Sequence, residues 1–385
     1  MPAELDLSPS IDESALEDLR RFEGKDIRVE PYNHEATLDT IRHYAWGIGD
    51  DNPLWTSTEH AVAAGHDNLL APPTFLYSVF DGAIGAGLPG VQPFYAGTRW
   101  RFFDYLRRGD AITPNSRFGE VREHRGRTAP YFLVQTALTD YTVGGKVIAH
   151  ATAETFRVPR RGADGGQGLS YPFREEHVYT DAELDAIREQ ALNEFRRGSS
   201  PLDPARVNVG DVIPAVVKGP IDQIAMTAYY AGCIGSPGYK GVELAWKYRD
   251  FAANDPGKLP SNYDPSYFAE KVLPSLGHQN SGVAREIGMP NAYDNGPQRC
   301  GWFAHAVTNW MGDFSFLETL EIKLRRPDIF GDTVWIGGEV AGIETAGENA
   351  RITVTMTGTN QLGDVVATGG ATVLTNGGRH PARPE

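Results

Sequence analysis

The chain has 385 residues, of which 41% are hydrophobic and 22% are charged, as in an ordinary globular protein that can bury a sizeable core. The formal net charge of −14 argues against general nucleic-acid binding, which needs a basic surface. Two cysteines, Cys233 and Cys300, are too few for a disulfide framework or a cysteine-based zinc site. No apolar run approaches the roughly 18 residues of a membrane span, and the acidic N-terminus lacks a signal-peptide core, so we expect a cytoplasmic protein.

Two amphipathic helices frame the first part of the chain. Apolar residues at helical spacing predict a helix near 13–22 and another over 181–197. The second begins behind a T-x-x-E capping box formed by Thr180 and Glu183.

Breaks in the sequence predict the domain boundaries. Residues 158–170 are rich in Gly and Arg, and residues 198–206 break the chain again. We therefore expect an N-terminal domain over 1–158, a linker with one helix over 159–206, and a C-terminal domain over 207–385.

The two domains resemble each other as copies of one unit. YAWGIGD at 44–50 aligns with YAGCIGS at 230–236, an offset of 186 residues. Farther along, Ala61 aligns with Ala284, an offset of 223 residues. The second copy therefore carries an insertion of 37 residues near 237–277, and repetition at this length indicates a duplicated domain.

Each copy has the same order of predicted elements. A long apolar helix is expected at 74–84 in the first copy and at 297–311 in the second. Four alternating runs that predict strands follow each helix, near 97–106, 111–123, 130–141 and 146–158, and near 316–326, 333–344, 349–360 and 364–375. A long helix followed by an antiparallel sheet that must cover it indicates the α+β class.

One motif is specific enough to suggest a family. The run Gly49-Asp50-Asp51-Asn52-Pro53-Leu54-Trp55 resembles the signature of MaoC-like, (R)-specific enoyl-CoA hydratases, a Gly-Asp-x-Asn-Pro-aliphatic-His run with a small residue six positions after the His. APPTFLYSVF at 71–80, RRGD at 107–110 and VGGKVIAHATAETFRV at 143–158 are also similar to that family. The resemblance implies a tandem double hot-dog, in which an antiparallel sheet wraps a long central helix in each half and the two sheets lie side by side. It also leaves open a homodimer of double hot-dogs.

The two copies depart from that signature in different ways. In the first copy Trp55 replaces the catalytic His, and an indole cannot exchange a proton near neutral pH. In the second copy His278 lies six residues before Ala284, the spacing of the signature, whereas Ser236 stands where its Asp is expected. The second copy is therefore predicted to hold the working site, with Asp50 and Trp55 of the first copy left to shape the substrate pocket.

The chemistry assigns roles to residues around His278. Adding water across an enoyl thioester needs a proton-transfer group, which His278 supplies, and a donor for the thioester oxygen. The resemblance gives that donor as the Gly296 N–H at the start of the second central helix. Asp294 is the predicted carboxylate partner, although a helix cap is the alternative for an Asp at this place. The remaining predicted substrate contacts are Tyr293, Asn295, Arg299 and Tyr239.

Several neighbouring residues have competing interpretations. Arg299 could equally form a salt bridge, and Asp264 is a weaker source of the missing acid. Lys323, Arg325 and Arg326 could serve an anionic CoA tail or form a solvated strand face. His305, on the second central helix, is interpreted as a core histidine.

The predicted function is reversible hydration or dehydration of an acyl thioester, 2-enoyl to 3-hydroxyacyl. CoA is favoured over an acyl carrier protein as the carrier, and no metal, cofactor or nucleic acid is expected. Loss of one of two equivalent sites leaves room for a bulky acyl group. Two alternatives stay open: a thioesterase that uses Asp81 or Asp294, and a non-catalytic subunit that binds acyl thioesters, because the signature is incomplete in both copies.

Overall fold

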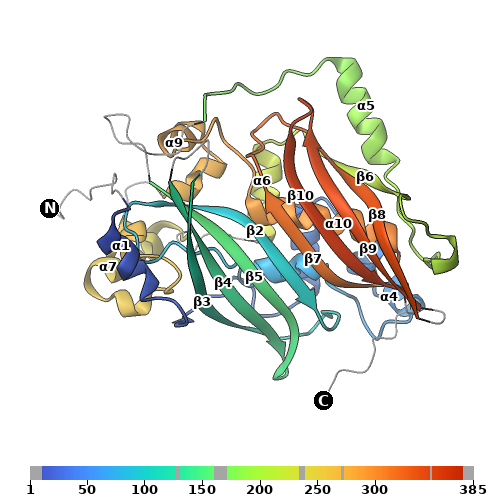
Figure 1. The fold of residues 1–385 in the computed structure, drawn as a ribbon, viewed down its shortest axis with the longest axis horizontal. Helices are drawn as coiled ribbons and strands as arrows, with labels where there is room; N and C mark the ends of the chain where they lie inside the picture. Colours follow the sequence, from blue (N-terminus) through green and yellow to red (C-terminus); the bar gives the residue numbers. More distant parts are fainter. Residues whose placement is uncertain are drawn as a thin grey trace.

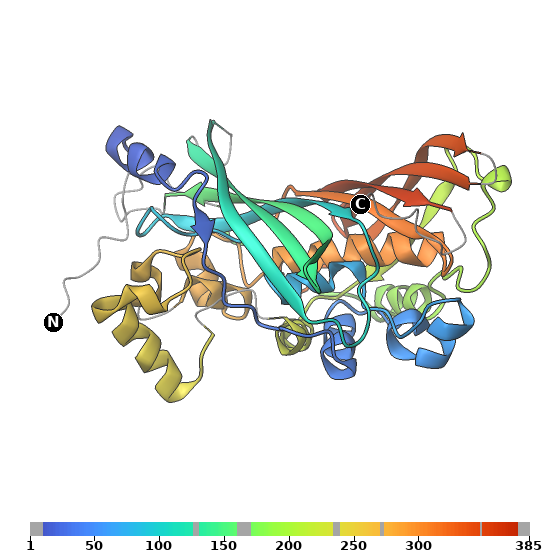
Figure 2. The ribbon, with the colours of Figure 1, turned by 90° about the horizontal axis from the view of Figure 1, so that it is seen from below.

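The computed structural model describes residues 11–125, 131–159, 171–233, 239–269, 273–346 and 349–375. Within these ranges the strands form one sheet of ten, in the order β1-β3-β4-β5-β2-β7-β10-β9-β8-β6. All of its pairings are antiparallel. Most helices lie against one face of this sheet, as Figure 1 and Figure 2 show.

The eight long predicted strands are confirmed. In the N-terminal half they are β2 (Gln92–Phe102), β3 (Ile112–His124), β4 (Phe132–Val143) and β5 (Lys146–Val158), and in the C-terminal half β7 (Phe316–Leu324), β8 (Val334–Ala346), β9 (Asn349–Asn360) and β10 (Val365–Leu374). Two shorter strands that were not predicted, β1 (Asp26–Ile27) and β6 (Val212–Lys218), form the two edges.

The two halves join through β2 and β7, which pair from Gly97 and Lys323 to Arg101 and Thr319. A Cβ atom at Gly97 would lie 2.1 Å from the carbonyl oxygen of Ile322. Only a glycine therefore permits the strands to approach so closely at this end of the junction. The side-by-side arrangement of the two sheets expected from the sequence is present.

The central helix of the C-terminal half is also confirmed. It is α10 (Gly296–Met311), and every residue from Pro297 to Met311 is buried. Such a helix has no solvent face because the sheet covers one side and the elements of the other half cover the rest.

The corresponding helix of the N-terminal half is absent, so the prediction for 74–84 is wrong. Only the 3₁₀ helix η1 (Pro73–Ser78) forms there. Beyond it the buried guanidinium of Arg157 donates hydrogen bonds to the carbonyls of Gly85, Ala86 and Leu88. The amides of Gly85 and Ala86 donate to the Asn262 carbonyl of the insertion. These partners satisfy backbone groups that would otherwise need a helix.

The remaining helices are shorter than α10. They are α1 (Glu13–Arg20), α2 (Leu38–Gly47), α3 (Pro53–Thr56), α4 (Thr58–Ala63), α5 (Asp181–Leu192), α6 (Gln223–Gly232), α7 (Val242–Asn254), α8 (Pro265–Ala269) and α9 (Ser281–Glu286), with the 3₁₀ helices η2 (Pro204–Arg206), η3 (Pro256–Lys258) and η4 (Pro274–His278). In the described ranges no helix combines the length and the apolar character needed to cross a lipid bilayer.

The linker helix α5 begins at its predicted capping box, in which Thr180 and Glu183 each bind the other's backbone amide. It ends at Leu192, five residues before the predicted end. The first part of the predicted linker, residues 160–170, lies outside the described residues.

Helices α2 and α6 pack against each other at equivalent places in the two copies. A Cβ at Gly47 would lie 2.8 Å from the Tyr229 Cα, and a Cβ at Gly232 would lie 2.5 Å from the His43 backbone. Each glycine therefore admits the other helix. This reciprocal contact agrees with the alignment of the two motifs in the sequence.

Candidate functional site

A cavity of about 320 Å³ lies between the two halves. Aromatic residues of β2, β4 and β5 form its N-terminal wall, namely Phe94, Tyr95, Phe132 and Phe156. The C-terminal half contributes Tyr230, His278, Tyr293, Asn295 and Gly296, and the inserted segment contributes Tyr263, Tyr267 and Ser275. The volume is that of a site for a small ligand or for part of a larger one.

His278, at the end of η4, lines this cavity in a defined tautomer. Its Nδ1 lies 3.2 Å from the carbonyl oxygen of Tyr293 and 3.0 Å from that of Asp294. Carbonyl oxygens only accept hydrogen bonds, so Nδ1 carries a proton and Nε2 of the neutral ring holds a lone pair. Burial lowers the pKa of His278, although the two carbonyls and the Asp294 charge oppose it. The ring is therefore a neutral base.

The first turn of α10 borders the same cavity, which Gly296 lines. The N-cap residue Asn295 makes no side-chain capping bond, and no hydrogen bond among the described residues engages the Gly296 amide. A Cβ at Gly296 would lie 2.9 Å from both the Leu324 Cδ1 and the Tyr95 Cβ. Glycine at this position thus allows Leu324 and Tyr95 to pack closely against the start of the helix.

Asp294 does not orient His278 through its carboxylate. Arg299 Nε donates to Asp294 Oδ2 at 2.7 Å, and both side chains are almost fully buried. Only the Asp294 backbone carbonyl reaches the histidine ring. The helix-cap alternative is not realised either.

Arg299 is likewise committed to the protein. Its Nε lies 3.0 Å from Asp328 Oδ2, and its Nη1 donates to the carbonyls of Arg326 and Val366. Burial lowers the pKa of Arg299, but the negative charges of Asp294 and Asp328 outweigh burial and raise that pKa overall. Arg299 lines the cavity, but as an ion-pair residue rather than a free substrate contact.

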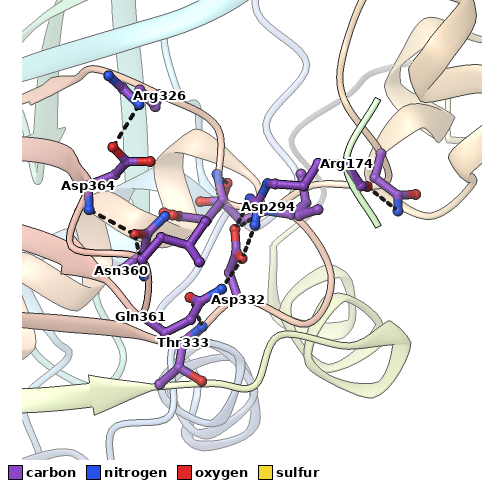
Figure 3. A network of polar contacts seen from close by, with 12 residues as sticks. Arg174, Asp294, Arg326, Asp332, Thr333, Asn360, Gln361 and Asp364 are labelled. Atoms are coloured by element: carbon purple, nitrogen blue, oxygen red, sulfur yellow. Dashed lines mark hydrogen bonds and ion pairs between the residues drawn. The ribbon is translucent and has the colours of Figure 1, made fainter. Parts of the chain in front are cut away.

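The ion pairs continue around the loop between β7 and β8 (Figure 3). Arg174 Nη1 donates to Asp332 Oδ1 at 2.6 Å, and Gln361 Nε2 donates to the same oxygen at 2.6 Å. Arg326 pairs with Asp364 at 2.8 Å on the surface. This network holds the end of β7 beside the cavity.

Asp50 and Trp55 are not among the residues that line this cavity, and Trp55 lines a smaller pocket beside Leu54. Trp55 Nε1 donates to Asp50 Oδ2 at 2.9 Å, and both residues are buried. His305 Nε2 lies 3.5 Å from Asp50 Oδ1 and 2.9 Å from Glu194 Oε1. A polar network therefore occupies the first copy's motif, and His305 is a satisfied core histidine as interpreted.

Lys218 completes that network. Its ammonium donates to the carbonyls of Ile48 and Gly49 and to His305 Nδ1. Burial lowers the pKa of Lys218 to about 8. Burial also raises the pKa of Glu194, but the hydrogen bond from His305 and the charges of His305 and Lys218 outweigh burial and lower that pKa to about 2. The sequence carried no signal for this cluster, because its members are far apart in the chain.

The other predicted residues fall in different places. Tyr293 and Asn295 line the cavity. Tyr239 does not; its ring stacks on Tyr230 at 5.1 Å and its hydroxyl donates to the Ser275 carbonyl. The Asp264 carboxylate accepts from the Ser266 amide at the start of α8. Ser236 lies outside the described residues.

A carboxylate of the other half was missed as a member of this site. Asp81 lines the same cavity as His278. The sequence suggested Asp81 only as a possible catalytic carboxylate of a thioesterase. No spacing in the sequence could have joined residues so far apart. Within the described residues, no group of three or more His, Cys, Asp or Glu side chains is arranged to hold a metal ion.

The fold and this cavity define a fused double hot-dog protein with one histidine-bearing site between its halves. Residues 22–151 match the family model described as FAS1-like, dehydratase domain region. A UPF0336 protein of Parafrankia sp. is 32% identical over 119 residues, covering 29% of this chain and 76% of that relative. A UPF0336 protein of Streptomyces coelicolor is 30% identical over 100 residues, covering 24% and 67%. The chain belongs to the family of these UPF0336 proteins.

Solved structures confirm the fold over nearly the whole chain. A protein described as a MaoC-like dehydratase has a TM-score of 0.61 at 14% identity, with 93% of this chain and 99% of that chain covered. A conserved hypothetical protein of Mycobacterium tuberculosis, described as having a double hotdog fold, has a TM-score of 0.54 at 11% identity, with 91% and 96% covered. The fold that the resemblance to MaoC-like dehydratases implied is confirmed, apart from the central helix of the N-terminal half.

Proposed function

We propose that this protein catalyses reversible hydration of a 2-enoyl thioester to a 3-hydroxyacyl thioester, with His278 as the proton-transfer residue. The observation that carries the proposal is the neutral His278 ring, whose Nδ1 is held by two carbonyls while Nε2 has no partner among the described residues. The start of α10 at Gly296 borders the same cavity. The match of residues 22–151 to a dehydratase-domain model supports the same class of reaction.

The chemistry needs only groups that border the cavity. A thioester oxygen placed at the Gly296 amide would be stabilised as it gains enolate character. His278 Nε2 takes a proton from water as the water oxygen bonds to C3 of the substrate. The same ring then returns the proton to C2, so the net change is addition of one water molecule across the double bond. No second carboxylate is required in this scheme.

CoA is the proposed carrier. Arg325 and Arg326 follow β7 and border the cavity. The Arg326 side chain is half exposed beside its partner Asp364. Guanidinium groups at this position suit the phosphates of a CoA tail. A carrier protein with a phosphopantetheine arm shares the thioester but lacks the nucleotide phosphates, so a comparison of the two carriers tests this assignment.

The test is turnover of a panel of 2-enoyl-CoA thioesters by the wild-type protein and by His278→Gln. The variant should lower kcat on the order of 10²–10⁴-fold, the usual contribution of a general acid–base residue. His150→Gln is the matched control, because His150 is half exposed and pairs with Asp140 away from the cavity. Equal activity of His278→Gln and wild type would refute the assignment. Release of free CoA from saturated acyl-CoA by the wild type would instead identify a thioesterase.

A further inference from the structure

The cavity contains a carboxylate that hydration by His278 does not use. Asp81 follows η1 in the N-terminal half and lines the same cavity. The Ala83 amide donates to its Oδ1 at 2.9 Å. Among the described residues, no Lys, Arg or His side chain forms an ion pair with Asp81. Asp81 is thus a carboxylate without a charged partner, an unfavourable state for a partly buried group.

The backbone around Asp81 is held in place by neighbouring elements. Gly82 has a φ of +77°, and a Cβ there would lie 2.4 Å from the Ala153 Cβ. The Tyr95 hydroxyl donates to the Asp81 carbonyl at 2.9 Å, and the Tyr141 hydroxyl donates to the Phe80 carbonyl. These contacts position the Asp81 side chain, so its place on the cavity wall is a property of the packed fold.

Asp81 and the proposed reaction centre lie at different parts of the cavity. The Tyr95 side chain begins against Gly296 and its hydroxyl donates to the backbone carbonyl of Asp81, so the length of a tyrosine side chain separates Gly296 from that carbonyl. The carboxylate whose charge acts on His278 is that of Asp294. The charge of Asp81 instead raises the pKa of Tyr95 and Tyr263, in addition to their burial.

The surroundings of Asp81 are aromatic, with hydroxyl groups at the ring edges. Tyr95 and Tyr263, on which the Asp81 charge acts, line the same cavity. Burial raises the pKa of Asp81 to about 7, although hydrogen bonds from the backbone amides of Ala83 and Asp81 oppose this effect. A ligand group that donates a hydrogen bond would stabilise the charged carboxylate further.

We propose that Asp81 recognises a hydroxyl group on the acyl part of the substrate, distant from the thioester carbonyl. The substrate class is then a 2-enoyl thioester whose acyl group carries a hydroxyl, with its carbon skeleton packed on the aromatic wall. The location of the thioester end rests on the function proposed above. The recognition of the hydroxyl group is independent of turnover and is measured as binding.

The experiment compares a saturated acyl-CoA with its ω-hydroxyacyl-CoA counterpart of equal chain length, using calorimetry on the full chain. We expect the wild type to bind the hydroxylated ligand roughly 10- to 100-fold more tightly, as for a hydrogen bond to a charged group. Asp81→Asn should keep part of this preference, because its carboxamide oxygen still accepts. Asp81→Leu should abolish the preference. Asp67→Asn, an exposed carboxylate away from the cavity, should leave it unchanged.

Four outcomes overturn the proposal. Equal affinity of the wild type for the two ligands removes the hydroxyl subsite. Tighter binding of an ω-amino ligand than of the hydroxyl ligand, lost entirely in Asp81→Asn, assigns the subsite to a cation instead. An unchanged preference in Asp81→Leu places the subsite elsewhere. An equal fall in kcat on all enoyl substrates in Asp81→Asn, with no change in ligand preference, makes Asp81 a catalytic group. If Asp81→Leu does not fold, the Asp81→Asn data alone decide.

These results separate the two proposals. Binding of the hydroxyl ligand without turnover of any enoyl thioester would support the Asp81 subsite and refute the hydratase. Turnover of an enoyl thioester without a preference for the hydroxyl ligand would support the hydratase and refute the Asp81 subsite.

Discussion

Replacement of Asp294 by Asn tests whether this carboxylate acts in catalysis or in the structure. Asp294 and Arg299 form a two-point ion pair with about 1–2% of each side chain exposed. Removing one partner of a buried pair typically costs about 3–5 kcal/mol because the other charge is left unpaired. Here Asp328 stays 3.0 Å from Arg299 Nε and keeps part of the compensation. We therefore expect Asp294→Asn to lower the free energy of unfolding by about 2–3 kcal/mol.

Turnover should respond much less than stability to this change. His278 is bound by the Asp294 backbone carbonyl, which the substitution leaves in place. We expect kcat of the folded variant to stay within about tenfold of the wild type, short of the loss of a proton-transfer group. Urea unfolding and kcat are the two measurements.

The matched control is Asp364→Asn, which removes a surface ion pair with Arg326 in the same network and should cost at most about 1 kcal/mol. The structural interpretation is refuted if Asp294→Asn loses kcat on the order of 10²-fold or more while its unfolding midpoint is unchanged.

Three further predictions follow from the same contacts. Burial lowers the pKa of His278, and the ring must be neutral to accept a proton. The value of kcat/KM should therefore stay constant at neutral pH and fall only below about pH 6.5; an increase of kcat/KM at acidic pH would contradict the role of His278 as a base. Asp50→Asn should change kcat little and lower stability by about 1 kcal/mol, since Asp50 bonds Trp55 away from the cavity; an inactive but folded variant would place a working site in the first copy. Gly82→Ala should lower the thermal unfolding midpoint, by about 2 kcal/mol or more in free energy, because of its positive φ and its contact with Ala153; an unchanged midpoint would contradict this.

Several parts of the fold could be read from the sequence because their signals are local. Alternation of apolar residues marks a strand that is buried on one face, and the eight long strands appear where it predicted them. The capping box at Thr180 involves residues three apart, so it needs no tertiary contact. The alignment of the two copies located His278, because the spacing to Ala284 survives the insertion.

The tertiary structure decided which backbone became a helix. Residues 74–84 and α10 have similar apolar sequences, yet only the second is helical. The difference is made by Arg157 and Asn262, which bond the backbone beyond η1 from distant places in the chain. Such partners cannot be read from a local pattern, because their effect depends on contacts that exist only after folding.

The tertiary structure also decided the roles of the acidic residues. Asp294, which lines the cavity, is bound to Arg299. Asp81 of the other half lines the same cavity without a charged partner. Asp50 keeps its place in the motif but bonds Trp55 and lies beside His305. The packing of the two halves therefore determines which carboxylates are paired with a cation of the protein and which are not. A carboxylate already paired with a protein cation is not free to bind a ligand.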